Sequence, residues 1–269
     1  MATTPAIQHP VLADDTFTVC AISVLAAMLA SVLHEGVGHA AIALATGAKS
    51  GLLTAIAWSS DYDSRLVAAC GTLANLAAGA VFWAALRSAR RRSITIRYFL
   101  LLNMAFNLFD GTGYFFFSGV TDFGDWARVI EGLNPHWVWR LSLVAVGVTS
   151  YFAAVMVVGK SFVQELGIPR DAGGRLGRLS MIPYFSAIVI IGLAGLMNPI
   201  SVSLVWQSAL PATAGAHSGL LWFRYYIPKT TTPATSPDFI GRSYAWIGVA
   251  AASALLFVLV LGHGMTLTP

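Results

Sequence analysis

The stretch Leu33-His34-Glu35-Gly36-Val37-Gly38-His39-Ala40-Ala41 lies inside a long apolar run that begins near Phe17. Two imidazoles and a carboxylate are costly in the hydrocarbon of a membrane, and ionisable residues in such a segment mark a functional site by default. Imidazoles hold metal ions, and an adjacent carboxylate handles the protons of a metal-bound water. We therefore interpret the rest of the sequence around a metal site in this segment.

The composition indicates an integral membrane protein. Its 269 residues are 57% hydrophobic and only 10% charged, whereas a soluble domain carries about 25% charged residues. The formal net charge of +4 comes from basic residues in short loops between apolar runs, where such residues set membrane topology. The expected partner is therefore the lipid bilayer, and no nucleic acid is expected.

The apolar runs predict an all-α membrane protein, a polytopic helical bundle of six or seven transmembrane helices in one membrane domain, 1–269. Asp14-Asp15-Thr16 is a plausible start for the first helix. The segment 48–65 is too polar to span and predicts a re-entrant or interfacial hairpin. With the interrupted run 200–222 as an additional span, the spans are expected at about 17 to the low 40s, 66–86, 96–117, 137–158, 181–197 and 244–261.

Charged loops predict how the bundle is oriented. The loops 87–97 and 160–178 are basic, and the loop 118–136 is acidic. The positive-inside rule places the basic loops and the amino terminus in the cytoplasm and the acidic loop outside. The histidine cluster and Asp110 then fall at one depth, towards the outer side, as a shared site requires.

Three motifs together resemble one family. The segment from His34 to His39 resembles the His-Glu-x-x-His of zinc peptidases. Gly71-Thr72-Leu73-Ala74-Asn75 resembles the Gly-Pro-x-x-Asn found one helix later in the site-2 protease family of intramembrane zinc metallopeptidases. Phe106-Asn107-Leu108-Phe109-Asp110-Gly111 resembles the Asn…Asp-Gly stretch of that family. The match covers roughly residues 25–115, which implies a three-helix metallopeptidase-like core within 1–118 and accessory helices in 119–269.

The resemblance implies a zinc-dependent endopeptidase that cleaves membrane-protein substrates in or near transmembrane segments. His34, His39 and Asp110 would bind one zinc ion, which leaves a fourth position for water, as a catalytic zinc site needs. Glu35 would be the general base. The family also favours access from the cytoplasm, the side opposite to the one that the charge bias gives.

Several roles stay open at this stage. The resemblance implies that Asn75 and Asn107 orient the substrate or donate hydrogen bonds to the oxyanion, although Asn75 also suits plain hydrogen bonding between helices. Asp122 and Asp125 are the substitutes for the third ligand. Two imidazoles and a carboxylate suit zinc, but iron also accepts that set.

The motifs depart from the family in ways that yield a structural prediction. The two histidines are offset by five residues rather than four, which on an α-helix places their side chains about 140° apart instead of about 40°. A π-bulge restores a common face, and glycine tolerates the irregular backbone. We therefore predict a bulge at 35–38. Thr72 replaces the usual proline, and no proline lies between Asn107 and Asp110.

Three other functions compete with the peptidase. A metal-dependent membrane hydrolase or oxidase acting on lipid would favour more histidines near the site. A non-catalytic descendant that binds or escorts membrane proteins would hold no zinc. A transporter would favour matching broken spans in two halves of the chain, and the sequence shows no such pair. Substrate and oligomeric state are not encoded in any motif.

Overall fold

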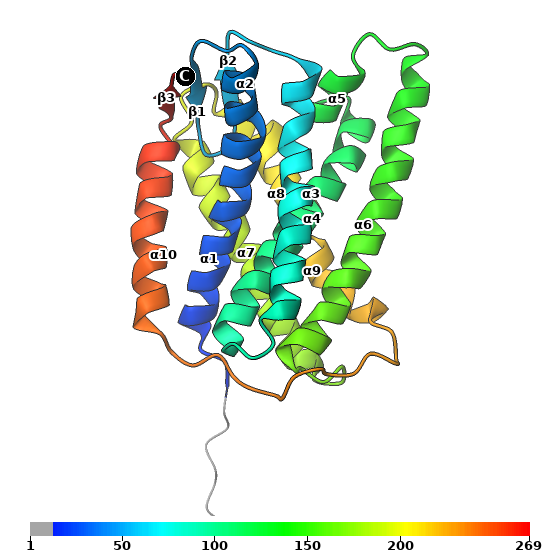
Figure 1. Cartoon of the computed structure of the whole chain (residues 1–269), viewed down its shortest axis with the longest axis vertical. Coiled ribbons are helices and arrows are strands. Elements are labelled where there is room, and N and C mark those ends of the chain that lie inside the picture. The colour runs from blue at the N-terminus through cyan, green and yellow to red at the C-terminus, as the bar shows by residue number, and fades with distance from the viewer. Residues whose placement is uncertain (1–12) are drawn as a thin grey trace, which may run out of the picture.

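The structure, a computed structural model, describes residues 13–269 and is 71% helical. Five helices are long and apolar enough to cross a membrane, and Figure 1 shows them packed side by side in one bundle. They are the continuous helix Thr16–Thr46, α3 (Arg65–Ser88), α6 (His136–Leu166), α7 (Gly173–Leu196) and Tyr244–Leu261, which combines α10 (Tyr244–Leu256) with η4 (Phe257–Leu261). The prediction of a mostly helical protein with apolar helices of membrane-spanning length is therefore confirmed, whereas the described residues contain five such helices and not the six or seven predicted.

The first helix begins where the sequence predicts. Asp15 caps it, and the Asp15 carboxylate accepts a hydrogen bond from the Thr18 backbone N–H at 2.9 Å. Such a cap satisfies one of the backbone donors that a helix start leaves unpaired. Three segments follow one another without a break: α1 (Thr16–Val32), the π-helix η1 (Leu33–Ala40) and α2 (Ala41–Thr46).

The run 200–222 forms short helices instead of a span. They are the π-helix η2 (Val205–Ala209), α8 (Leu210–Ala216) and α9 (Gly219–Trp222), and the short 3-10 helix η3 (Phe223–Tyr226) follows. The helix is continuous from Ser203 through Pro211 to Ala216, and the turn at His217-Ser218 ends it before it is long enough to span a membrane.

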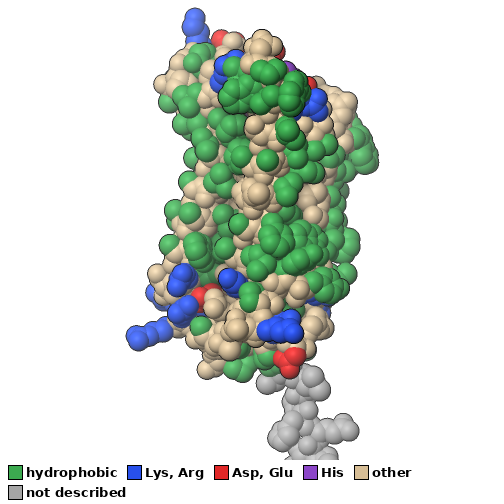
Figure 2. All heavy atoms as spheres, turned by 90° about the vertical axis from the view of Figure 1, so that its right-hand side faces the viewer, with side chains coloured by type: hydrophobic (Ala, Val, Ile, Leu, Met, Phe, Trp, Pro, Cys, Tyr) green, Lys and Arg blue, Asp and Glu red, His purple; other side chains and the backbone are tan. Residues whose placement is uncertain are grey.

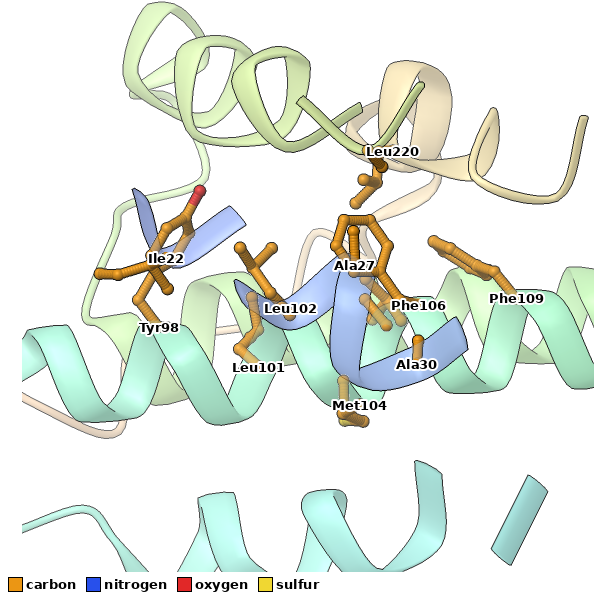
Figure 3. Close-up of a cluster of buried hydrophobic side chains, with 14 of the residues drawn as sticks. Ile22, Ala27, Ala30, Tyr98, Leu101, Leu102, Met104, Phe106, Phe109 and Leu220 are labelled. Atoms are coloured by element: carbon orange, nitrogen blue, oxygen red, sulfur yellow. The ribbon is translucent and has the colours of Figure 1, made fainter. Parts of the chain in front are cut away.

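The helix α4 (Ile94–Thr121) forms the centre of the bundle and packs against α1, α3 and α6. Figure 3 shows Ile22 and Ala27 of α1 and Leu220 of α9 near the buried α4 side chains Leu102 and Phe106. Lipid tails are as apolar as leucine, so van der Waals packing, more than the hydrophobic effect, holds such helices together. Close packing against α4 therefore sets the positions of α1, α3 and α6, whereas α7 and α10 pack against α1.

The segment 48–65 forms a β-hairpin at one end of the bundle. The strands β1 (Gly51–Leu53) and β2 (Trp58–Ser60) pair antiparallel, with Leu52 opposite Ser59. The strand β3 (Met265–Leu267) pairs with the other edge of β1, so β2 is an edge strand in the order β2-β1-β3. The sequence predicts the hairpin but not the third strand.

The surface carries an apolar band between two charged ends. Figure 2 shows one side of the molecule, where hydrophobic side chains cover the middle and Lys and Arg side chains gather at the ends. On α6, Leu141, Val146, Val148 and Phe152 are exposed. The turns joining α3 to α4 and α6 to α7 lie at the end opposite to α5 (Asp125–Ile130) and the sheet (Figure 1). The basic and acidic loops therefore lie at opposite ends of the bundle.

Candidate metal centre

The histidine cluster lies in a π-helix. The segment η1 covers Leu33–Ala40, and the Ala41 N–H bonds to the Gly36 carbonyl, five residues back. In a π-helix this wider turn brings residues five apart onto one side. The bulge predicted at 35–38 from the histidine offset is therefore confirmed, and it spans the whole motif.

Both imidazoles and one carboxylate converge on one point. The Nε2 atoms of His34 and His39 are 3.2 Å apart, and Asp125 Oδ2 lies 3.1 Å from the first and 3.4 Å from the second. Ligand bonds of about 2.0–2.2 Å in a tetrahedral zinc site place donor atoms about 3.3 Å apart. The potential ligand atoms of the three side chains all lie within 4.8 Å of one another. The three side chains therefore have the spacing of a metal-binding triad.

The chemistry of the three donors also fits a metal ion. Asp125 Oδ2 is shielded from solvent and has no aligned hydrogen-bond partner among the described residues, although both imidazoles lie close to it. Each of the three side chains therefore directs an atom that can bind a metal towards the point where they meet. Burial alone raises the pKa of the Asp125 carboxyl, but the charges of His39 and His34 hold that pKa below its usual range.

Asp125 is the first residue of α5 (Asp125–Ile130), a six-residue helix between α4 and α6. An ion pair of 2.6 Å between Arg128 and Asp63 ties α5 to the segment before α3. The other substitute, Asp122, ends α4 in the left-handed conformation and lies 3.0 Å from His136 Nε2. Of the two substitutes, the structure brings only Asp125 to the histidines.

Asp110, the third ligand that the resemblance implies, lies elsewhere. Its Oδ1 atom is 2.9 Å from His217 Nε2, and it is not part of the triad. Tyr114, one helical turn further along α4, stacks on the His34 ring with centroids 5.1 Å apart. The histidines therefore lie level with Tyr114, one turn beyond the depth at which Asp110 projects.

The two asparagines lie on the Nδ1 side of the His34 ring, away from its Nε2 atom and the other two ligand atoms. Asn75 Oδ1 is 2.6 Å from His34 Nδ1, and Asn75 Nδ2 donates to Asn107 Oδ1 at 2.8 Å and to the Ala30 carbonyl at 3.1 Å. His39 Nδ1 is 2.8 Å from the Val67 carbonyl. Both Nδ1 atoms therefore act as donors, which leaves the Nε2 lone pairs for a metal.

Replacing Asn75 by alanine is expected to weaken metal binding about 10–100-fold, because His34 then loses the acceptor that fixes its tautomer and ring orientation. Metal affinity of the purified protein, measured by competition with a chelating dye, tests this expectation. Asn103→Ala is a matched control. Asn103 lies on α4 and is buried like Asn75, but its amide donates to the Phe99 carbonyl and does not contact a histidine. Equal affinities of the two variants would contradict the role of Asn75.

Glycines allow the imidazoles to lie directly against α3. A Cβ atom on Gly38 would lie 2.4 Å from Gly71 Cα, and a Cβ on Gly71 would lie 2.4 Å from His39 Nε2 and 2.8 Å from His34 Nε2. Real Cβ atoms do not approach so closely, so η1 and α3 meet backbone to backbone. The Gly71–Asn75 motif thus combines close packing with the hydrogen bond to His34.

Glu35 lies beside the triad and lines a cleft. This cleft has a volume of about 350 Å³ and is also lined by His39, Asp125 and the strand β2. The Trp58 backbone N–H of β2 lies close to the Glu35 carboxylate. Glu35 is 9% exposed and lines the cleft, so its carboxylate is largely buried while remaining accessible from the cleft.

The chain matches no protein-family model, and no curated protein or solved structure is similar enough to show a relationship.

Proposed function

We propose that this protein is an intramembrane zinc-dependent endopeptidase, divergent from but similar to the site-2 proteases. The observation that carries the proposal is the convergence of His34, His39 and Asp125 on one point, with Glu35 beside them. A polar constellation of this kind, placed on an apolar helix, matches the chemistry of metal-assisted hydrolysis.

The roles of the residues follow from their positions. His34, His39 and Asp125 would hold a zinc ion, and a bound zinc ion would lower the pKa of a water molecule towards neutrality and polarise the scissile carbonyl. Glu35 would take a proton from the attacking water as the water oxygen adds to the carbonyl carbon, and would return a proton to the departing amine as the C–N bond breaks. Asn75 and Asn107 keep His34 oriented.

The edge strand β2 suits an unwound peptide as substrate. The sheet order β2-β1-β3 leaves one edge of β2 unpaired in the sheet, and residues Trp58–Ser60 line the cleft beside Glu35. An extended segment adds to such an edge through main-chain hydrogen bonds. A transmembrane helix must give up its internal hydrogen bonds before its backbone is open to attack, and the edge of β2 offers replacements.

Removal of the metal is expected to abolish peptide cleavage, because the hydrolytic water then loses its acidity. The measurement is cleavage of a fluorogenic peptide library by the purified protein in detergent, before and after treatment with a chelator. Added zinc should restore activity, and elemental analysis of the untreated protein would distinguish zinc from iron. Cleavage that persists in fully metal-depleted protein would rule out a metallopeptidase.

An apolar cavity favours lipid hydrolysis as a second candidate function. The cavity has a volume of about 550 Å³, lies between α4, α6 and α8, and shares Tyr114 with the metal cleft. Its lining includes Phe116, Val148, Phe152 and Trp222. These side chains suit an acyl chain, so release of fatty acid from phospholipid vesicles, together with an absence of peptide cleavage, would favour this function.

A further inference from the structure

Asp110 and His217 form a polar pair for which the proposed peptidase mechanism has no use. The Asp110 Oδ1 and His217 Nε2 atoms are 2.9 Å apart. His217 is 3% exposed and packs on the Phe106 ring with centroids 4.3 Å apart. The Asp110 side chain is 21% exposed. An imidazole buried against an aromatic ring is thus joined to a carboxylate that stays partly accessible.

The His217 imidazole has unmet hydrogen-bonding capacity. Its Nδ1 atom has no hydrogen-bond partner among residues 13–269, and its Nε2 atom, although close to Asp110, is not aligned with the carboxylate for a hydrogen bond. Leaving a buried polar group unsatisfied costs free energy, and native proteins satisfy nearly all such groups. The geometry therefore indicates a small hydrogen-bonding ligand next to this ring.

A cavity of about 60 Å³ joins the pair to the metal centre. Asp110, His217, Glu35 and His34 all line it, together with Ser31 and Thr213. One bound water needs about 10–15 Å³ of such volume and two to four polar partners. The cavity is therefore large and polar enough for a few water molecules, and it is too small for a peptide or a lipid chain.

We propose that Asp110 and His217 anchor a cluster of bound water in this cavity, and that the cluster supplies the hydrolytic water to the metal centre. The binding of water needs no assumption about catalysis, whereas the supply role rests on the proposed peptidase function. Each turnover consumes one water: a hydroxyl adds to the carbonyl carbon, the C–N bond breaks, and the remaining proton goes to the amine. The cavity would keep that water next to Glu35 and His34, which line it as well.

Radiolytic footprinting of the purified protein tests the water cluster directly, because hydroxyl radicals formed from bound water oxidise adjacent side chains even when these are buried. We expect rapid labelling of His217 in the wild type and in Asp110→Asn, which keeps hydrogen-bonding groups. Labelling should be lost in Asp110→Leu, because the leucine side chain has nearly the same shape as the aspartate side chain but cannot form hydrogen bonds with water. Unlabelled His217 in the wild type, or equal labelling in the two variants, would overturn the proposal.

Cleavage and zinc content measured on the same variants test the supply role. Asp110→Leu should keep its zinc but cleave at least about tenfold more slowly than Asp110→Asn, as expected for loss of one hydrogen bond that holds water. If Asp110→Leu does not fold, His217→Phe, which preserves the packing on Phe106, is compared with His217→Gln. Equal cleavage rates within a pair would overturn the supply role.

The two proposals fail in different ways. A wild type that labels at His217 but cleaves no peptide would contradict the peptidase function and leave the water site standing. A wild type that cleaves peptide while His217 remains unlabelled would contradict the water site alone. Two metal ions per chain, with the second lost in His217→Gln, would show that the pair binds a cation instead of water.

Discussion

Glu35→Gln is expected to abolish peptide cleavage while leaving the zinc bound. The glutamine amide has nearly the shape of the carboxylate but cannot accept the proton of the attacking water, and loss of a general base costs about 10²–10⁴-fold in rate. The Nε2 and Oδ2 donors of His34, His39 and Asp125 remain in place, because Glu35 is not part of the triad. Cleavage rate and zinc content of the purified variant are the two measurements.

Glu131→Gln provides the matched control for this substitution. Its carboxylate is 61% exposed on the surface near α5 and pairs with Arg128. We expect this variant to cleave like the wild type. Undiminished cleavage by Glu35→Gln would remove Glu35 from the mechanism, and loss of zinc from that variant would make Glu35 a ligand.

Asp125→Asn is expected to lower zinc affinity by more than the about 10–100-fold typical of a residue that only orients a ligand. The change removes the anionic donor of the triad and leaves two neutral imidazoles. Asp110→Asn is the counterpart with the same chemical change, and it should bind zinc like the wild type, because Asp110 pairs with His217. Zinc affinities of the two variants, measured by dye competition, decide which aspartate is the ligand.

The reverse order of affinities would restore the ligand set that the family resemblance implies. Asp110 would then have to approach the histidines in the metal-bound protein, with Asp125 displaced from its position 3.1 Å from His34 Nε2. Equal loss in both variants would mean that the two aspartates act through one connected site.

The helices were predictable because hydropathy in a membrane protein is a strong and local signal. The runs 66–86 and 137–158 predict the cores of α3 and α6, and the structure extends both helices to Arg65–Ser88 and His136–Leu166. The run 200–222 is apolar enough on average, but the turn at His217-Ser218 divides it. Average hydropathy does not register such interruptions, so the number of spans was the weakest part of the prediction.

The local geometry of the histidine segment followed from residue spacing alone. Two histidines five residues apart share a face only on a widened turn, and η1 provides it. The third ligand of the triad, Asp125, was predicted only as a substitute for Asp110, because its position depends on where a short helix after α4 folds back. Asp110 lies within α4 and Asp125 follows the end of that helix. Both are acidic, and the sequence does not show which of the two faces the histidines. Tyr114 and Trp58, which contact His34 and Glu35, carry no sequence signal of their own.

X-ray absorption at the zinc edge of the purified wild-type protein tests the central claim most directly. We predict one zinc ion per chain bound by two imidazoles and oxygen donors, with Zn–N distances of about 2.0–2.1 Å. His39→Ala should remove one imidazole from that spectrum or remove the metal. Protein that takes up no metal, or a spectrum with a single imidazole or with sulfur ligands, would contradict a site built from both histidines of the π-helix.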